Sequence, residues 1–517
     1  MLTGDMLRRS AQRFPHKAAI IFRGLGRREV VSYRELDAAA NRLAHALLAL
    51  GLARGAKVSM LSRNLPEYGG VFFGVARTGY VVNNISILYA PEELAWVLNK
   101  SDTQVLIFDA QFAGNVAAIR ANCPGIRHFI AIGDAPAVDN AVPYAQFVDG
   151  FPGAAPDVTL NERDAFCMTY TGGTTGRPKG VLMNHRARHI TAHTVAFEER
   201  LTDADVVAIV TPLFHVAALN IMFQPAMLVG ATCVFITPWS ADAFLDAAEA
   251  ERITAGFMVP TQANALCTHA QLETRDLSAW TKLSFAGAPM PDWVQVELMK
   301  RLPHLKLTQI YGQSEMGVIA ALPPAYLPAK LGSVGRQPYN VDVAVLRPDG
   351  TPAAPGEMGE VASRGDNLMM EYCNEPEQTA QFFKLGKGWG LTGDVGVVDE
   401  DGFITLIDRA KDMLISGGEN VYPKEIEQVL YQLPEVAECA VFGIPDDKWG
   451  EVPAAYLLLK AGCTLDEARV LAQCEAKLAR LKRPRLVKFV DSFPKTPIGK
   501  IQKNLLKEPY WAGRKKI

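Results

Sequence analysis

Segments with a strand pattern and segments with a helix pattern alternate along the first third of the chain, and this alternation constrains the fold most strongly. Helical spacing of apolar residues covers 33–50 and 66–77, and apolar runs with strand character lie at 57–61, 103–108, 255–259, 282–285 and 306–310. Helices that connect successive strands leave those strands parallel and cover the faces of the sheet. The sequence therefore predicts an α/β fold with a largely parallel sheet.

The pattern changes near Asn340. Short strands separated by turns are expected at 341–346, 359–363, 395–398 and 403–408. After Arg409, a run of strands and helices of about 100 residues has the size of a small α+β domain. We predict a large N-terminal domain, residues 1–409, made of α/β subdomains plus a small β-rich subdomain. A small α+β C-terminal domain, residues 410–517, follows.

The charge of the chain is divided unevenly. The 517 residues hold 53 lysines and arginines and 55 acidic residues, a formal charge of −2 that points to no particular partner. From Lys477 to Ile517, however, 13 lysines and arginines stand against only Asp491 and Glu508. An acidic body thus ends in a basic segment. On charge alone this segment is either a solvated tail or a part that works on an anionic ligand.

Cysteine spacing and the N-terminus predict a cytoplasmic protein. The eight cysteines contain no CxxC pair, which argues against a zinc site and favours reduced, buried thiols. No apolar run follows Arg8 and Arg9, so no signal peptide is expected. The 36 residues from Val206 to Ala241 lack charge, but prolines and polar residues interrupt them. A buried helix and a buried strand at 232–237 are expected there, not a membrane span.

The most informative motif lies at 169–180, Thr-Tyr-Thr-Gly-Gly-Thr-Thr-Gly-Arg-Pro-Lys-Gly. Its glycines allow close approach of a ligand, its threonines supply hydroxyl donors and its lysine supplies a positive charge, which together suit a polyphosphate. The motif departs from a Walker loop, because Gly180 follows Lys179, and it lacks the GxGxxG spacing of a dinucleotide site. The residues expected to bind phosphate are Thr171, Gly172, Gly173, Thr174, Thr175, Gly176 and Lys179.

This loop resembles the signature of the adenylate-forming superfamily, and we place the chain in its acyl-CoA synthetase branch. Gly172 stands where the superfamily often has serine. Further blocks match in the superfamily's order across nearly the whole chain: 212–215 (Pro-Leu-Phe-His), 287–289 (Gly-Ala-Pro), 311–315 (Tyr-Gly-Gln-Ser-Glu), 392–394 (Thr-Gly-Asp), 408–412 (Asp-Arg-Ala-Lys-Asp), 416–420 (Ser-Gly-Gly-Glu-Asn) and 494–500 (Pro-Lys-Thr-Pro-Ile-Gly-Lys).

The resemblance implies a reaction in two halves. A carboxylate attacks the α-phosphorus of ATP to give acyl-AMP and pyrophosphate, and the thiol of coenzyme A then displaces AMP. Glu315 is the expected Mg²⁺ ligand and Lys500 the expected catalytic lysine of adenylation. The remaining residues that the resemblance assigns to ATP and AMP are Gly287, Ala288, Pro289, Tyr311, Gly312, Gln313, Ser314, Asp394 and Arg409, with Asp394 on the ribose hydroxyls.

By the same resemblance the C-terminal domain is mobile and rotates between the two half-reactions. Lys411 occupies the hinge position, and Ser416, Gly417 and Gly418 are expected near the pantetheine thiol of coenzyme A. The basic C-terminal segment that contains Lys500 then faces anionic nucleotides. Nucleic acid is not an expected partner, whereas contact with a membrane surface and a homodimer are left open.

The expected acid is apolar and carries no amine. His215 resembles the residue between the acyl pocket and the thiol tunnel, where it acts as a gate or positioner, and no acidic side chain follows Phe214 to hold an ammonium. The pocket wall is expected at Ala217, Ile221, Ala286, Met316 and Val318. Small apolar side chains favour a medium- or long-chain fatty acid. An aryl or alicyclic acid is the alternative, and a luciferase-like oxygenase that oxidises the adenylate is a more distant one.

Three histidines, His185, His189 and His193, stand four residues apart and could imitate a metal-binding face. No acidic fourth ligand accompanies them, so we expect an ordinary helix there. A non-catalytic nucleotide sensor would lack Lys500 or Glu315, and both residues are present.

Overall fold

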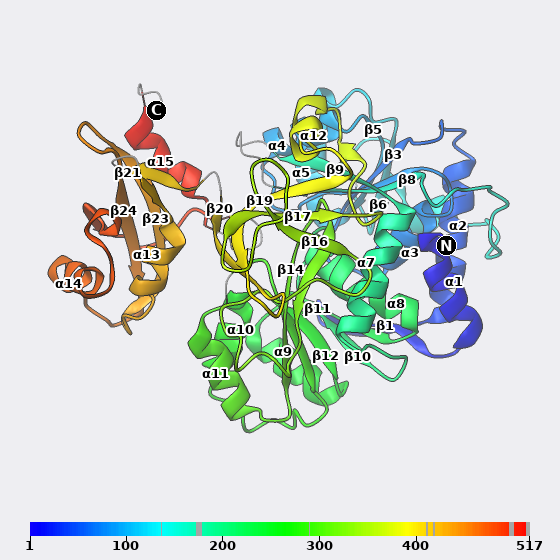
Figure 1. Cartoon of the computed structure of the whole chain (residues 1–517). Coiled ribbons are helices and arrows are strands. Elements are labelled where there is room, and N and C mark those ends of the chain that lie inside the picture. The colour runs from blue at the N-terminus through cyan, green and yellow to red at the C-terminus, as the bar shows by residue number, and fades with distance from the viewer. Residues whose placement is uncertain are drawn as a thin grey trace. The chain divides into compact units, whose positions relative to one another are not determined.

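The computed structural model describes residues 1–135, 137–171, 178–288, 290–409, 412–416, 419–495 and 501–512. Figure 1 shows its helices and strands in chain order by colour. Its contacts divide the chain into two compact units. The first comprises Met1–Leu331, Gly335–Asp342 and Ser363–Gly390, and the second comprises Gly332–Val334, Val343–Ala362 and Leu391–Ile517. The boundary expected at 409/410 falls inside the second unit and stays a prediction.

The first unit holds two eight-stranded sheets. One has the order β15-β14-β13-β12-β10-β11-β1-β2. Its strands are β1 (Ala18–Gly24), β2 (Arg27–Ser32), β10 (Val206–Ile209), β11 (Thr232–Thr237), β12 (Ala255–Met258), β13 (Lys282–Phe285), β14 (Lys306–Gln313) and β15 (Gly317–Leu322). Neighbouring strands are parallel except at the two edges, where β2 and β15 run antiparallel to their partners.

The other sheet has the order β18-β9-β8-β4-β3-β5-β6-β7. Its strands are β3 (Lys57–Leu61), β4 (Val81–Asn84), β5 (Thr103–Asp109), β6 (His128–Ile132), β7 (Val142–Pro143), β8 (Ala165–Thr171), β9 (Lys179–Asn184) and β18 (Glu371–Tyr372). Only the pairs β8–β9 and β9–β18 are antiparallel. The expected largely parallel α/β architecture is therefore present.

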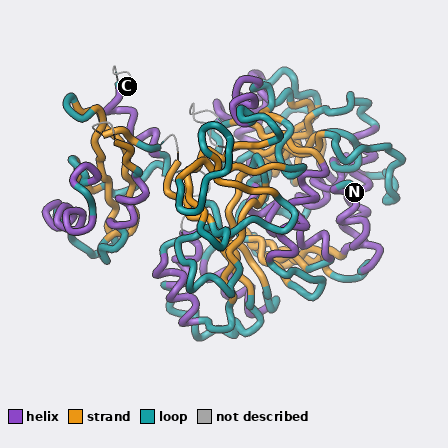
Figure 2. The backbone as a smooth tube through the Cα atoms, viewed as in Figure 1, coloured by secondary structure: helices purple, strands orange, loops and turns teal. Residues whose placement is uncertain are grey.

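Helices surround both sheets (Figure 2). They are α1 (Thr3–Arg13), α2 (Tyr33–Leu48), α3 (Glu67–Val75), α4 (Pro91–Lys100), η1 (Ala110–Phe112), α5 (Ala113–Ile119), η2 (Arg120–Asn122), α6 (Tyr144–Val148), α7 (His185–Glu198), the π-helix η3 (Ala217–Phe223), α8 (Gln224–Val229), α9 (Ala241–Ala250), α10 (Pro260–Cys267), α11 (Asp292–Arg301) and α12 (Pro376–Phe382). Helix α2 begins at a capping box, in which the Ser32 hydroxyl accepts from the Glu35 amide and the Glu35 carboxylate accepts from the Ser32 amide.

Helix α3 joins the cores of the two sheets. Phe72 packs edge-on against Phe166 of β8, and Phe73 contacts Phe223 of η3. A side-chain carbon on Gly69 would lie 3.1 Å from the Ile20 side chain of β1, so this face of α3 packs closely against that strand. The apolar cluster that results runs from one sheet to the other and gives the site residues a rigid support.

The second unit contains two smaller sheets. Most of the four-stranded sheet belongs to it, in the order β16 (Asp342–Leu346), β17 (Met358–Arg364), β19 (Trp389–Val398) and β20 (Ile404–Arg409). The five-stranded sheet has the order β22-β21-β24-β23, with β25 on β24; these strands are β21 (Leu414–Ser416), β22 (Glu419–Val421), β23 (Val436–Asp446), β24 (Gly450–Leu459) and β25 (Leu486–Phe489). Its helices are α13 (Pro423–Leu430), α14 (Glu467–Lys477), η4 (Arg480–Lys482) and α15 (Lys503–Trp511).

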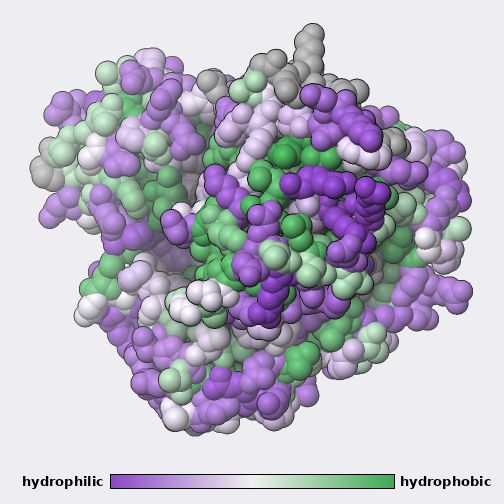
Figure 3. All heavy atoms as spheres, turned by 90° about the vertical axis from the view of Figure 1, so that its left-hand side faces the viewer, coloured by the Kyte–Doolittle hydropathy of each residue, from purple (hydrophilic) through white to green (hydrophobic). Residues whose placement is uncertain are grey.

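The uncharged stretch from 206 to 241 folds as expected. It forms β10, η3, α8 and β11, and all of β11 is buried. In the part of the chain that the structure describes, no helix has the length and apolar character needed to cross a membrane. Figure 3 shows hydrophobic residues interspersed with hydrophilic ones on the face that it presents. Seven of the eight free cysteines are buried, the exception being Cys463.

Candidate active site

The sequence motifs of the first unit follow the carboxyl ends of its strands. In the first sheet, residues 212–215 come after β10, Gly287 and Ala288 after β13, and 311–315 at the end of β14. Strands β10, β12, β13 and β14 are parallel neighbours, so these motifs reach the same edge of the sheet. Ligands of open α/β sheets bind at this edge, which makes it the candidate site.

A tight turn between β14 and β15 carries the acidic motif. Tyr311 is half-buried and Gly312 exposed at the end of β14, whereas Ser314 and Glu315 are each 8% exposed. A bulge interrupts the β14–β15 ladder at Gly312, where a side-chain carbon would collide with the Gly317 carbonyl oxygen. The close backbone approach therefore requires glycine and fixes the direction of the turn.

Glu315 is held by a residue that the sequence motifs do not contain. The Tyr372 hydroxyl donates to Glu315 Oε1 at 2.8 Å, and the Met369 amide donates to the Glu315 carbonyl at 2.7 Å. Lys179 Nζ lies 5.0 Å from the centre of the Tyr372 ring. Tyr372 thus contacts the expected metal ligand and the expected phosphate-binding lysine together.

Electrostatics of this cluster follow from its burial. Burial lowers the pKa of Lys179, and the carboxylates of Glu315 and Glu375 raise it by a smaller amount. Burial also raises the pKa of the Tyr372 phenol, and the negative charge of Glu315 adds to this rise. The phenol therefore stays protonated and donates to the carboxylate at neutral pH.

Only pairing within the sheet brings Tyr372 to this place. Strand β18 pairs with β9, so that Tyr372 stands opposite Val181, two residues after Lys179. The contact between Lys179 and Tyr372 could not be predicted from the sequence, because the two residues are far apart in the chain. Nothing in the local pattern of Glu371–Tyr372 identifies its partner strand. Tyr372 is therefore a candidate site residue that the sequence motifs do not reveal, and it contacts both Glu315 and Lys179.

The phosphate motif lies on the β8–β9 hairpin. Thr171 ends β8 and stands opposite Lys179, which begins β9, so both expected ligands sit at the base of the hairpin. The five residues between them that we expect to bind phosphate lie outside the described residues, and so do five other predicted site residues; these ten are Gly172, Gly173, Thr174, Thr175, Gly176, Pro289, Lys411, Gly417, Gly418 and Lys500.

The donor set at Glu315 fits a hard divalent cation. Among the described residues no group of three or more histidines, cysteines or acids is arranged to hold a metal ion. Mg²⁺ commonly binds one or two carboxylates together with substrate phosphates and water, which agrees with a single buried carboxylate. Such an ion would neutralise charge on the phosphates of a bound nucleotide.

His215 is neutral at physiological pH. Burial lowers its pKa to about 4, and its Nδ1 accepts a hydrogen bond at 3.2 Å from the Ala217 amide. The accepting Nδ1 leaves the proton on Nε2. His215 precedes the π-helix η3, a geometry that is frequent at functional sites. A fixed, neutral ring agrees with a gate or positioner and disfavours a proton carrier.

The expected pocket wall lies in the interior. Ala217 and Ile221 of η3 and Val318 of β15 belong to one buried apolar cluster, with Ala286 packed against it. Met316 is fully buried, and its carbonyl accepts from Asn367 Nδ2 at 2.8 Å. The structure thus gathers four of the five residues around one core; their contact with a substrate stays a prediction.

The two expected nucleotide ligands of the second unit face each other. Asp394 of β19 stands opposite Arg409 of β20, and Arg409 Nε lies 3.2 Å from Asp394 Oδ1. The Asp394 side chain is 10% exposed and that of Arg409 36% exposed. The Thr392 hydroxyl accepts from the Asp394 amide at 3.0 Å. This pair offers a carboxylate with a guanidinium beside it, a suitable combination for ribose hydroxyls and phosphate.

The remaining described residue of the expected coenzyme A site, Ser416, is buried. It ends β21, where it pairs with Gly450 of β24 and Glu419 of β22. The backbone at Ser416 is therefore held by a neighbouring strand on each side.

The three spaced histidines lie on helix α7, as expected. His185 stacks on Phe166, and its Nδ1 accepts from the Thr3 amide at 3.3 Å. His193 Nδ1 lies 2.9 Å from the His189 carbonyl. These contacts account for the histidines as parts of the helix packing.

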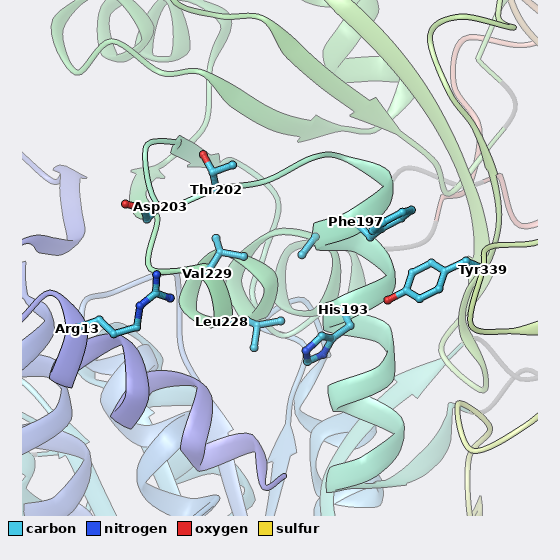
Figure 4. A pocket seen from close by; sticks show the side chains of 9 residues that line it. Arg13, His193, Phe197, Thr202, Asp203, Leu228, Val229 and Tyr339 are labelled. Carbon is cyan, nitrogen blue, oxygen red and sulfur yellow. The ribbon is translucent and has the colours of Figure 1, made fainter.

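A surface hollow of about 490 Å³ lies elsewhere in the first unit (Figure 4). Helices α1, α7 and α8 contribute most of its lining, which consists of Arg13, His193, Ala196, Phe197, Thr202, Asp203, Leu228, Val229 and Tyr339. In Figure 4 the Tyr339 hydroxyl points toward His193. None of the predicted site residues lines this hollow, so its size alone does not make it the active site.

Comparison with protein families gives two matches. A family described as AMP-binding enzyme matches residues 7–373, and one described as AMP-binding enzyme C-terminal domain matches residues 425–500. The first match covers more than half of the chain and includes the motifs that end at 315.

Individual relatives align over almost the whole length. A feruloyl-CoA synthase from Amycolatopsis is 35% identical over 496 residues, 96% of each chain. The long-chain-fatty-acid–CoA ligase FadD13 of Mycobacterium tuberculosis is 35% identical over 515 residues, 98% of each chain. The crystal structure of the anthranilate CoA ligase AuaEII with anthranoyl-AMP matches with a TM-score of 0.89 at 27% identity, over 99% of this chain and 97% of that one.

Proposed function

The chain belongs to the AMP-binding enzyme family, in its acyl-CoA synthetase branch, and from this premise we propose which acid it activates. As an AMP-forming acid–thiol ligase it uses ATP and coenzyme A. The acid's carboxylate oxygen bonds to the α-phosphorus as pyrophosphate leaves, and the thiol sulfur then bonds to the acyl carbon as AMP leaves.

The proposed substrate is an apolar monocarboxylic acid, a medium- or long-chain fatty acid. The observation that carries this proposal is the interior wall of Ala217, Ile221 and Val318, which offers apolar surface and no charged side chain. His215, at the start of this wall, is neutral and supplies no cation for a second carboxylate. Burying an unpaired charge in such surroundings costs several kcal/mol, which disfavours amino acids and dicarboxylates.

An aryl acid is the second candidate. A feruloyl-CoA synthase, an indoleacetate–CoA ligase at 35% identity and an anthranilate CoA ligase are among the proteins that this chain resembles. A hydroxycinnamate is also an apolar body with one carboxylate. The same wall therefore accommodates its chemistry, and the length and width of the pocket decide between the two classes.

We assign the catalytic steps to the motif residues. Glu315 would hold Mg²⁺, Lys179 and the hairpin threonines would bind phosphate, and Asp394 would accept from the ribose hydroxyls. Lys500 would bridge carboxylate and phosphate oxygens during adenylation. Support comes from the buried Glu315–Tyr372–Lys179 cluster and from the Asp394–Arg409 pair.

An exchange assay between ATP and radioactive pyrophosphate tests this proposal. The panel contains decanoate, palmitate, ferulate, 4-coumarate, indoleacetate and anthranilate, each with and without coenzyme A. Phenylalanine and 3-phenylpropanoate form a matched pair that differs only in the amino group. We expect exchange with fatty acids and with 3-phenylpropanoate, and none with phenylalanine. Exchange with no acid in the panel would refute the proposed substrate class.

A further inference from the structure

The described residues on either side of 496–500 pair with each other. Lys495 and Ile501, on either side of residues 496–500, form an antiparallel bridge. One residue further out, the Gln502 amide donates to the Pro494 carbonyl at 2.8 Å. Two backbone contacts thus tie the chain before this segment to the chain after it, directly next to the start of α15.

Apolar and polar contacts fix α15 to the five-stranded sheet. Ile501, Leu506 and Tyr510 pack against the cluster that contains Phe442 and Tyr456. The hydroxyls of Tyr510 and Tyr456 are 2.6 Å apart, and Trp511 Nε1 donates to the Gly443 carbonyl at 3.1 Å. These contacts hold the body and the far end of the helix on β23 and β24, and leave its first turn to be held by other groups.

Lys503, the first residue of α15, connects this first turn to α13. Its Nζ lies 2.7 Å from Glu427 Oε1 of α13, and the two side chains are only 19% and 15% exposed. A cation at a helix N-terminus is unfavourable, because the helix dipole is positive there, and the first turn of α15 holds no acid. The Glu427 carboxylate offsets both the dipole and the cost of burial.

The same ammonium also interacts electrostatically with Asp408 of β20. Asp408, at the end of β20, accepts from the Arg409 amide at 2.7 Å and from the Lys424 amide at 2.8 Å. Burial raises the pKa of Asp408, and the charge of Lys503 opposes that rise. Burial by itself would lower the pKa of Lys503, but Glu427 and Asp408 together raise it. One buried cation therefore interacts with α13 and with the last acid before the hinge.

We propose that Lys503 is a positioning residue for adenylation, which fixes the start of α15, three residues after Lys500, on α13. The proposal rests on the proposed function of Lys500. Lys503 stands three residues after Lys500. It directly follows Ile501 and Gln502, which pair with Lys495 and Pro494. Loss of its charge releases the first turn of α15 while the apolar contacts of Leu506 and Tyr510 remain. We therefore expect the loss of this charge to lower the rate of adenylation much more than the free energy of unfolding.

The test separates the two half-reactions in the full-length enzyme. Acyl-AMP formation is followed in single turnovers with palmitate and with ferulate, and thioester formation is followed from synthetic palmitoyl-AMP and feruloyl-AMP with coenzyme A. We expect Lys503→Gln to slow acyl-AMP formation at least tenfold and to change thioester formation less than twofold. Lys503→Arg, which keeps the charge, should recover most of the adenylation rate.

Two variants of α13 supply a matched comparison. In the wild type, the Val441 amide donates to Glu427 Oε1 at 2.7 Å. Glu427→Gln removes the charge that pairs with Lys503 but keeps an oxygen that can accept this bond, so it should reproduce the effect of Lys503→Gln. Glu425→Gln, two residues away, breaks the Lys482–Glu425 pair of 2.7 Å and should leave both half-reactions unchanged. The proposal is overturned if Lys503→Gln behaves like Glu425→Gln, or if both half-reactions fall equally. A wild-type enzyme that exchanges with no acid would instead reject the proposed function.

Discussion

At the scale of single residues, burial decides the state of each charged group. Glu315 is buried and held by the Tyr372 hydroxyl, whereas His215 is kept neutral because nothing charged compensates the loss of water around it. Glu199 shows the same effect away from the site. Burial raises its pKa to about 7, while the Ser284 hydroxyl and Lys282 oppose this rise only weakly. Glu315 and Glu199 each support a prediction.

Tyr372→Phe should slow adenylation by roughly tenfold to a hundredfold. The substitution removes one hydrogen bond to a buried carboxylate, and such bonds contribute about 1.5–3 kcal/mol. Pyrophosphate exchange measured against Mg²⁺ concentration checks this, because a loosely held Glu315 should require more Mg²⁺. Tyr80→Phe, which loses a buried hydroxyl bonded to the Leu52 carbonyl, is the control. A normal Mg²⁺ requirement in Tyr372→Phe would contradict the role given to Tyr372.

Glu199 should make the folded protein less stable as the pH rises. Because the folded state binds this proton more tightly than the unfolded state, its stabilising effect is complete below pH 4.5 and is lost as the pH rises to about 7. The loss corresponds to roughly 3 kcal/mol. Urea unfolding between pH 5 and 8 should show this decline in the wild type and a much flatter profile in Glu199→Gln. The half-buried neighbour variant Glu198→Gln should keep most of the decline, and identical profiles of wild type and Glu199→Gln would refute the assignment.

At the scale of elements, the turn between β14 and β15 shows how backbone geometry places a functional side chain. Gly317 has a φ of +66°, and a side-chain carbon there would collide with Thr191 Oγ1 of α7. The turn that carries Ser314 and Glu315 is therefore pressed directly against a helix. The chain leaves no space for a side chain at Gly317, where it reverses direction. The position of Glu315 therefore depends on glycine at residue 317.

Gly317→Ala should destabilise the fold and displace the turn. A residue with a side chain in this conformation costs about 1–3 kcal/mol, to which the collision with Thr191 adds. Combining it with Thr191→Ala should recover the part due to the collision and leave the backbone strain. Thermal unfolding of the two single variants and the double variant measures this coupling. Purely additive effects would show that α7 does not press on the turn.

Strands with clear apolar runs were predictable from the sequence, and those shaped by contacts were not. Strand β3 and the buried β11 have the expected limits, since their side chains alone identify them. Strand β19 begins at Trp389, six residues before the expected start, because its glycines resemble a loop. Gly390 is in fact required, since a side-chain carbon there would collide with the Phe382 ring. Such a requirement is visible only in three dimensions.

The same distinction applies to the candidate site. Motifs identified Lys179, Glu315 and Asp394 because their neighbours in sequence are distinctive, whereas Tyr372 comes to the site through pairing of β18 with β9. The acyl pocket lies between these extremes. Its wall residues were predictable as apolar, but the space in front of them depends on the packing of η3 against α7, β10 and β12.

At the scale of the whole molecule, the uneven charge has a structural counterpart. The basic C-terminal segment contains α15 and Lys500. The ion pair Lys503–Glu427 ties it to helix α13, and the ion pair Lys495–Glu438 ties it to strand β23 of the five-stranded sheet. The division into two units places Glu315 in the first and Asp394 with Lys500 in the second. The residues proposed to bind the nucleotide are thus distributed over both units.

The most direct test of this account is to measure the two half-reactions of Lys500→Ala separately. Acyl-AMP formation should be abolished, because the cation that we propose to bridge carboxylate and phosphate is lost. Synthetic acyl-AMP should still react with coenzyme A at close to the wild-type rate, since we propose that this step uses a different face of the C-terminal domain. Equal loss of both half-reactions would contradict the alternation of the C-terminal domain between two catalytic roles.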